Sequence, residues 1–142
     1  MKPTLFLRIA SVLTIVHAIL HTIGGVFSKP DLGAAAVAFS AMQSNHFMVM
    51  GLSRSYADFY RGMGLGATIS LTIEGIVFWQ LGSLAISQGE RLRPVLASFC
   101  VAYLALAVNS SFYFFQAPVI VEILIAVLLG LAFVTAKPAR AA

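Results

Sequence analysis

Charged residues and cysteines are scarce in this 142-residue chain, and each shortage excludes a class of protein. Only 10% of the residues are charged, compared with about 25% in a typical soluble domain. Hydrophobic residues make up 60%, so the composition predicts an integral membrane protein surrounded by membrane lipid. Cys100 is the single cysteine, which excludes an intrachain disulfide and any Cys-x-x-Cys metal or redox motif.

The chain also lacks a run of basic residues. Its formal net charge is +4, but the Lys and Arg residues are spread over the ends of the apolar segments. This spread does not suit nucleic-acid binding, so no nucleic-acid partner is expected. The Lys and Arg residues instead indicate the orientation of a membrane protein, because these residues are enriched on the cytoplasmic side.

The apolar segments provide four predicted membrane crossings. About 20 helical residues cross about 30 Å of hydrocarbon, and the stretch 94–136 is roughly twice too long for one crossing. We place its turn at Asn109–Pro118, because Pro94 and Pro118 suit the first turns of new helices. The predicted helices are about 5–27, 56–87, 94–113 and 118–136, in a single domain, residues 1–142.

The basic residues predict that both termini are cytoplasmic. That orientation places six of them inside and three outside; inside are Lys2, Arg8, Arg91, Arg93, Lys137 and Arg140, and outside are Lys29, Arg54 and Arg61. The first loop, Asp31–Met50, is then outside, and its apolar residues favour a short interfacial helix. The expected fold class is therefore all-α, a polytopic four-helix bundle with a short outer interfacial helix in the first loop.

Ionisable and polar side chains interrupt the predicted crossings. On insertion scales, a charged group at the centre of a membrane helix costs about 2.5 to 3.5 kcal/mol. The helical rise places His17 level with Glu74 near mid-membrane, and His21 level with Asn109 and Glu122 nearer the outside. We predict that the residues at these two levels bind a ligand, and that His17 and Glu74 are the candidates for catalytic proton transfer.

The same residues have a purely structural interpretation. Polar groups within a membrane often join helices, and a His–Glu hydrogen bond contributes only about 1 kcal/mol or less. Gly62, Gly66 and Ser70 recur every four residues, a pattern that favours tight helix packing within one chain or between two copies. These alternatives stay open from the sequence.

A metal or haem site is a further alternative for the histidines. His17 and His21, four residues apart, can bind one ion together with Glu122. A bis-histidine haem would need His46, because neighbours on one helix cannot occupy opposite sides of the iron. The His-xxx-His spacing is too short to be specific, so no metal is assigned and the cofactor is unknown.

A charged cluster lies at the outer end of the second predicted crossing. Ser53 or Ser55 can cap the helix, and Asp58 can pair with Arg54 or Arg61, which are four residues before it and three after it. These residues are either an interfacial anchor or a ligand-binding rim above the histidine site.

Three motifs carry a resemblance to known proteins. They are His17-Ala-Ile-Leu-His21-Thr-Ile-Gly24, Arg54-Ser-Tyr-Ala-Asp58-Phe-Tyr60 and Trp79-Gln-Leu-Gly82. These motifs resemble a widespread group of small, uncharacterised four-helix bacterial membrane proteins, and the general layout is similar to that of DoxX-like proteins. The resemblance implies a multi-pass protein of the bacterial cytoplasmic (inner) membrane and implies no particular activity.

The leading functional hypothesis is an outward-facing polar pocket that binds a lipophilic or amphiphilic small molecule, such as a quinone. If the protein is an enzyme, His/Glu pairs are the natural proton donors and acceptors. One alternative is a non-catalytic accessory or assembly subunit of a membrane complex. The other is an oligomeric small-solute or proton-coupled carrier.

Overall fold

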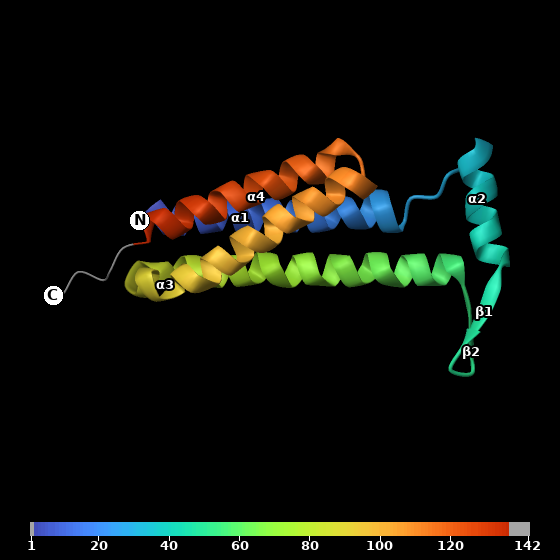
Figure 1. Ribbon diagram of the computed structural model, residues 1–142, viewed down its shortest axis with the longest axis horizontal. Helices are drawn as coiled ribbons and strands as arrows, with labels where there is room; N and C mark the ends of the chain where they lie inside the picture. Colours follow the sequence, from blue (N-terminus) through green and yellow to red (C-terminus); the bar gives the residue numbers. More distant parts are fainter. Residues whose placement is uncertain (1, 137–142) are drawn as a thin grey trace. The chain divides into compact units, whose positions relative to one another are not determined.

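The computed structural model describes residues 2–136, which are mostly helical (Figure 1). The elements are α1 (Lys2–Leu20), the π-helix η1 (His21–Val26), α2 (Gly33–Ser44), β1 (His46–Val49), β2 (Leu52–Ser55), α3 (Tyr56–Tyr113) and α4 (Gln116–Thr135). The predicted all-α class is confirmed, with one short hairpin added. Two compact units are present among the described residues: unit 1 comprises residues 2–17 with 71–136, and unit 2 comprises Ala18–Ser70.

Helix α3 is divided by a bend at Gln88. The backbone there is not helical (φ −127°, ψ 25°), and the chain turns back at this point (Figure 1). The predicted end of the second helix near residue 87 agrees with this bend. The predicted start of the third helix at Pro94 is wrong, because helical structure resumes at residue 89 and Pro94 lies inside the helix. Pro94 is tolerated there although it cannot donate to the carbonyl four residues earlier.

Helix α4 begins close to the predicted position. Helix α3 ends at Tyr113 and α4 begins at Gln116, with Phe115 as its N-cap. Pro118 therefore lies in the first turn of α4, where its missing N–H group leaves no helical hydrogen bond unmade. The predicted turn within Asn109–Pro118 is confirmed.

The core of unit 1 is built from α1, both halves of α3, and α4. Leu7 of α1, Phe78 and Leu96 of α3, and Ile125 of α4 are fully buried in one apolar cluster. The rings of Phe78 and Phe99 pack edge to face, with their centroids 5.0 Å apart. This contact joins the two halves of α3, so residues 71–87 and 89–113 lie side by side.

Much of the outer surface is apolar. Three helical stretches are long and apolar enough to cross a membrane: Lys2–Val26, Tyr56–Tyr113 and Gln116–Thr135. Large side chains are exposed along all three, for example Ile23, Val101 and Val134, each 65% exposed. A helix that exposes apolar residues on most of its surface is typical of a lipid environment or a protein interface.

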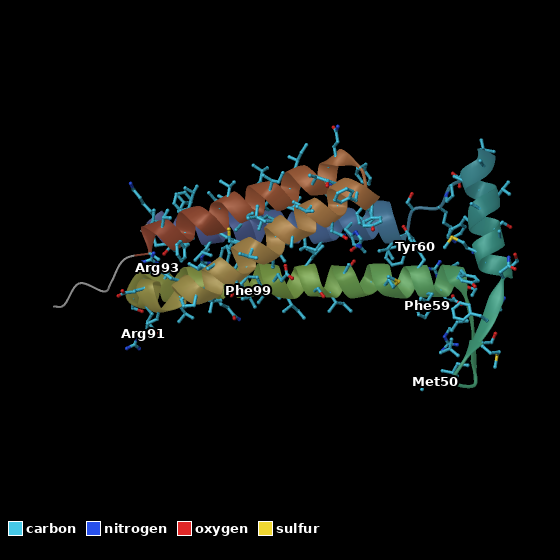
Figure 2. All side chains as sticks on the ribbon, viewed as in Figure 1. Met50, Phe59, Tyr60, Arg91, Arg93 and Phe99 are labelled. Atoms are coloured by element: carbon cyan, nitrogen blue, oxygen red, sulfur yellow. The ribbon has the colours of Figure 1, made fainter. Side chains whose placement is uncertain are left out.

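The first loop contains the predicted short helix and an unpredicted hairpin. Helix α2 confirms the helix, whereas its position on a membrane surface stays a prediction. Strands β1 and β2 pair antiparallel, with His46 opposite Ser55 and Val49 opposite Leu52. The turn has positive φ at both Met50 and Gly51, as a two-residue hairpin of type I′ requires. Met50 is at the tip (Figure 2).

Close helix approach occurs at glycines other than Gly62 and Gly66. A Cβ atom added to Gly62 or Gly66 would have no neighbour within 4 Å. A Cβ atom on Gly75 would lie 2.6 Å from Ile15 Cδ1 and 3.3 Å from the Ser11 carbonyl oxygen. Close packing of α1 on α3 in unit 1 therefore depends on Gly75. A role for Gly62 and Gly66 between copies stays a prediction.

We expect Gly75→Ala to lower the free energy of unfolding by about 1 to 3 kcal/mol, because the added methyl group overpacks the contact with Ile15. Thermal unfolding in detergent measures this change. Gly66→Ala is the matched control and should be neutral or stabilising, since alanine favours a helix. Ile15→Ala should partly restore the Gly75→Ala variant. Equal stability of the two alanine variants would contradict the prediction.

Candidate functional site

Glu74 is held by a hydrogen bond across the two halves of α3. The Tyr103 hydroxyl donates to Glu74 Oε2 over 2.6 Å, a short O–H···O distance. Tyr103 is 1% exposed, and Glu74 is half-buried. Thr14, fully buried in α1, is a further polar neighbour of the Tyr103 hydroxyl. Glu74 is thus fixed by a buried partner rather than extended toward the surface.

Glu122 is buried and has one unsatisfied oxygen. Ser110 Oγ donates to Glu122 Oε1 over 3.0 Å, which joins the end of α3 to the start of α4. Oε2 of Glu122 is buried and has no hydrogen-bond partner within residues 2–136. Leaving such a group unpaired costs about 1 to 3 kcal/mol, and more when it is charged. This oxygen can therefore accept a hydrogen bond from a bound donor or take up a proton.

Two hydrogen-bonded pairs, Tyr103 with Glu74 and Ser110 with Glu122, are together called the carboxylate cluster. Tyr103 and Ser110 are two helical turns apart on α3, and both carboxyl groups act electrostatically on the Tyr103 hydroxyl. The cluster can accept hydrogen bonds, and its carboxyl and hydroxyl groups can exchange protons with a bound molecule.

The sequence predicted the two carboxyl groups and missed their hydroxyl partners. Tyr103, Ala107 and Ser110 are spaced by four and three residues, so they share one helix face, and all three are buried. That spacing was the available signal. Asn109, a predicted ligand-binding residue, is one position away and is exposed. Its role in binding stays a prediction.

His17 and His21 lie in different units of the chain. His17 is a half-buried residue of α1 in unit 1. Its predicted pairing with Glu74 stays a prediction, as does the grouping of His21 with Asn109 and Glu122. Tyr103 is the partner of Glu74 described above.

His21 begins the π-helix η1 and contacts α3 within unit 2. Its Nε2 lies 3.1 Å from the Gly64 carbonyl oxygen, and since a carbonyl can only accept, Nε2 carries the hydrogen. Beside it the hydroxyls of Thr22 and Thr68 are 2.9 Å apart. A Cβ atom on Gly64 would lie 2.9 Å from Val26 Cγ2, so glycine is needed there. The role of His21 visible in unit 2 is to join two helices.

The charged cluster at the start of α3 forms a helix cap. The Asp58 amide donates to Ser55 Oγ, and the Ser55 amide donates to Asp58 Oδ2, each over 3.1 Å. This reciprocal pair is a capping box, and it shows that Ser55 is the capping residue. Arg54 Nη1 donates to the Ser53 carbonyl, and both Arg54 and Arg61 act electrostatically on Asp58. The cap therefore gives Ser55 and Asp58 a structural role, and the role of this cluster as a ligand-binding rim stays a prediction.

The cavity in the structure and the predicted site do not coincide. An open cavity of about 220 Å³ lies at the turn between α3 and α4; it is lined by Ser111, Phe114, Phe115, Gln116, Val119 and Ile120. None of the predicted ligand-binding residues is among these. Within residues 2–136, no group of three or more His, Cys, Asp or Glu residues is arranged to hold a metal ion.

We expect Tyr103→Phe to lower the free energy of unfolding by about 1 kcal/mol, because the variant leaves Glu74 without this donor. Tyr113→Phe is the matched control, since Tyr113 is 78% exposed. Adding Glu74→Leu, which removes the acceptor, completes a double-mutant cycle, whose coupling energy should be about 0.6 to 1.7 kcal/mol. A coupling energy of zero would show that the hydrogen bond does not stabilise the fold.

Comparisons with known proteins return no match to this chain. No protein-family model, curated protein or solved structure is similar to it at a significant level. The functional argument therefore depends on the residues and contacts described above.

Proposed function

We propose that the protein is a four-helix integral membrane protein of the bacterial inner membrane, and that it binds a lipophilic or amphiphilic small molecule at the carboxylate cluster. The lengths of the helices support four crossings. Unbent, the 58 residues of α3 would extend about 87 Å, nearly three times the hydrocarbon thickness. The bend at Gln88 instead yields two segments of crossing length, beside α1 with η1 and α4.

The exposed apolar residues support a lipid environment. Unit 1 has large apolar residues that are more than half exposed, for example Ile73, Val101 and Val127. Removing apolar surface from water stabilises a protein by about 25 cal/mol per Å², so this exposure would be unfavourable in water. Lipid chains would cover these side chains. The distribution of Lys and Arg supports cytoplasmic termini, with six basic residues on that side against three.

Oε2 of Glu122 is the observation that carries the binding proposal. It is buried without a hydrogen-bond partner within residues 2–136, although its other oxygen is bonded to Ser110. A carboxyl oxygen accepts a hydrogen bond when ionised and can donate one when protonated. A ligand with a hydroxyl, amine or quinone carbonyl group on a lipophilic body fits this requirement.

The second candidate function is a non-catalytic accessory or assembly subunit. It is favoured by the number of polar side chains already engaged between helical segments of unit 1. Ser11 Oγ donates to the Gly75 carbonyl oxygen over 2.6 Å, and Tyr103 and Ser110 donate to the two glutamates. In that case the polar groups stabilise the bundle and the exposed apolar surface contacts a partner protein.

Purification in mild detergent followed by solvent extraction and mass spectrometry tests the proposal. We expect the wild type to retain one lipophilic compound beyond the bulk phospholipids. Glu122→Gln should reduce its amount at least about tenfold, because a hydrogen bond to a charged group contributes about 1.5 to 3 kcal/mol.

Glu90→Gln is the matched control, because Glu90 is exposed near the bend and should not affect retention. A wild-type preparation without a specific compound, in which Glu122→Gln changes stability alone, would favour the accessory subunit. Equal retention by Glu122→Gln and the wild type would place the ligand elsewhere.

A further inference from the structure

Within residues 2–136, the basic side chains of unit 1 gather toward one end of it. The start of α1, the bend of α3 and the end of α4 meet there (Figure 1). We define the basic end as Lys2, Arg8, Arg91 and Arg93; Arg91 and Arg93 are labelled beside the bend (Figure 2). Glu90 is the acidic residue beside the bend, so four cations and one carboxylate make a formal charge of +3.

Arg8 is held flat against α3 at this end. Its Cζ lies 3.5 Å from the centroid of the Trp79 ring, and its Nη2 donates to Ser83 Oγ over 2.9 Å. A Cβ atom on Gly82 would lie 3.3 Å from Arg8 Nε, so the missing side chain leaves room for the guanidinium. Trp79 and Gly82 belong to one of the sequence motifs, and this contact explains both.

The surroundings of Arg8 combine a phosphate-binding group with an apolar surface. A guanidinium has five N–H donors in a planar fork, which matches a phosphate group, and Ser83 receives one of them. Trp79 is 49% exposed; Leu5, three residues before Arg8, and Ile86, three residues after Ser83, are 58% and 77% exposed. Tryptophan is enriched where a protein meets the headgroup region of a membrane.

Arg93 repeats this arrangement nearby. Its Cζ lies 4.5 Å from the centroid of the Phe133 ring of α4. Arg91, two residues earlier, is exposed. The basic end therefore offers two arginines stacked on aromatic rings and one exposed arginine. Each basic residue near a membrane surface strengthens the binding of anionic lipid about fivefold.

We propose that the basic end is a binding site for an anionic phospholipid, with the phosphate on Arg8 and the acyl chains along Trp79. The charge selects anionic over zwitterionic headgroups, and the stacked guanidinium fixes the phosphate beside the ring. This site is separate from the carboxylate cluster, but it rests on the proposed membrane position of the chain.

Trp79 is the single tryptophan of the protein and therefore reports on this site directly. The full-length protein is placed in vesicles of equal parts phosphatidylglycerol and phosphatidylcholine, in which one lipid or the other carries brominated acyl chains. Bromine quenches tryptophan fluorescence at contact, while the headgroup composition stays constant. We expect brominated phosphatidylglycerol to quench Trp79 more, with a relative association constant at least about fivefold above that of phosphatidylcholine.

Arg8→Gln should reduce this preference about fivefold, and Arg8→Lys should reduce it less, because lysine keeps the charge and loses the planar fork. Lys29→Gln removes the same charge from unit 2 and should leave the preference unchanged. If the Trp79 emission in vesicles without bromine shows that Arg8→Gln is misfolded, Arg91→Gln replaces it, because Arg91 is exposed.

The outcomes separate this proposal from the membrane position on which it rests. Equal quenching of the wild type by the two lipids would overturn the anionic site and leave the membrane position intact. A wild-type preference that persists in Arg8→Gln, or in Arg91→Gln where it replaces that variant, would also overturn the site. The absence of quenching by either lipid would overturn both proposals.

Discussion

The burial of Glu74 in unit 1 depends on its hydrogen bond from Tyr103, which also joins the two halves of α3. Residues 71–87 and 89–113 are antiparallel neighbours because the chain turns back at Gln88. The Phe78–Phe99 contact and the Tyr103–Glu74 bond lie one helical turn apart along this pair. In an apolar environment a carboxyl group without such a partner would oppose burial, so the pairing lets a glutamate be part of the bundle.

Unit 1 carries two kinds of chemistry in different places. The carboxylate cluster lies in the interior and pairs two hydroxyl donors of α3 with carboxyl acceptors of α3 and α4. The basic end is formed by donor groups at the helix ends, with aromatic rings beneath two of the arginines. Such a separation suits a protein whose interior selects a lipophilic ligand while its edge is held at a charged membrane surface.

The sequence predicted the helical segments well because their apolar length is set by simple geometry. It predicted Glu74 and Glu122 as special because charges are rare in such segments. It did not predict the partners Tyr103 and Ser110, because a hydroxyl side chain is less costly to place in an apolar segment than a charged one and is therefore a weaker signal. The start of the third helix was misplaced because a proline favours a first turn without requiring one, and the bend occurred earlier at Gln88. The β1–β2 hairpin was missed because Met50–Gly51 is not among the strongest turn sequences.

The π-helix η1 constrains the number of residues in this segment as well as the identity of its buried ones. A π turn contains one more residue than an α turn, so it rotates everything that follows it around the helix axis. With that extra residue, Val26 becomes the buried side chain against Gly64, while Gly24 and Ser28 are exposed. Loss of one residue between His21 and Val26 would restore α-helical hydrogen bonding but would turn Val26 away from Gly64. The segment is thus constrained by its length: exposed positions can change their residue, whereas an insertion or deletion would shift the register of the helix.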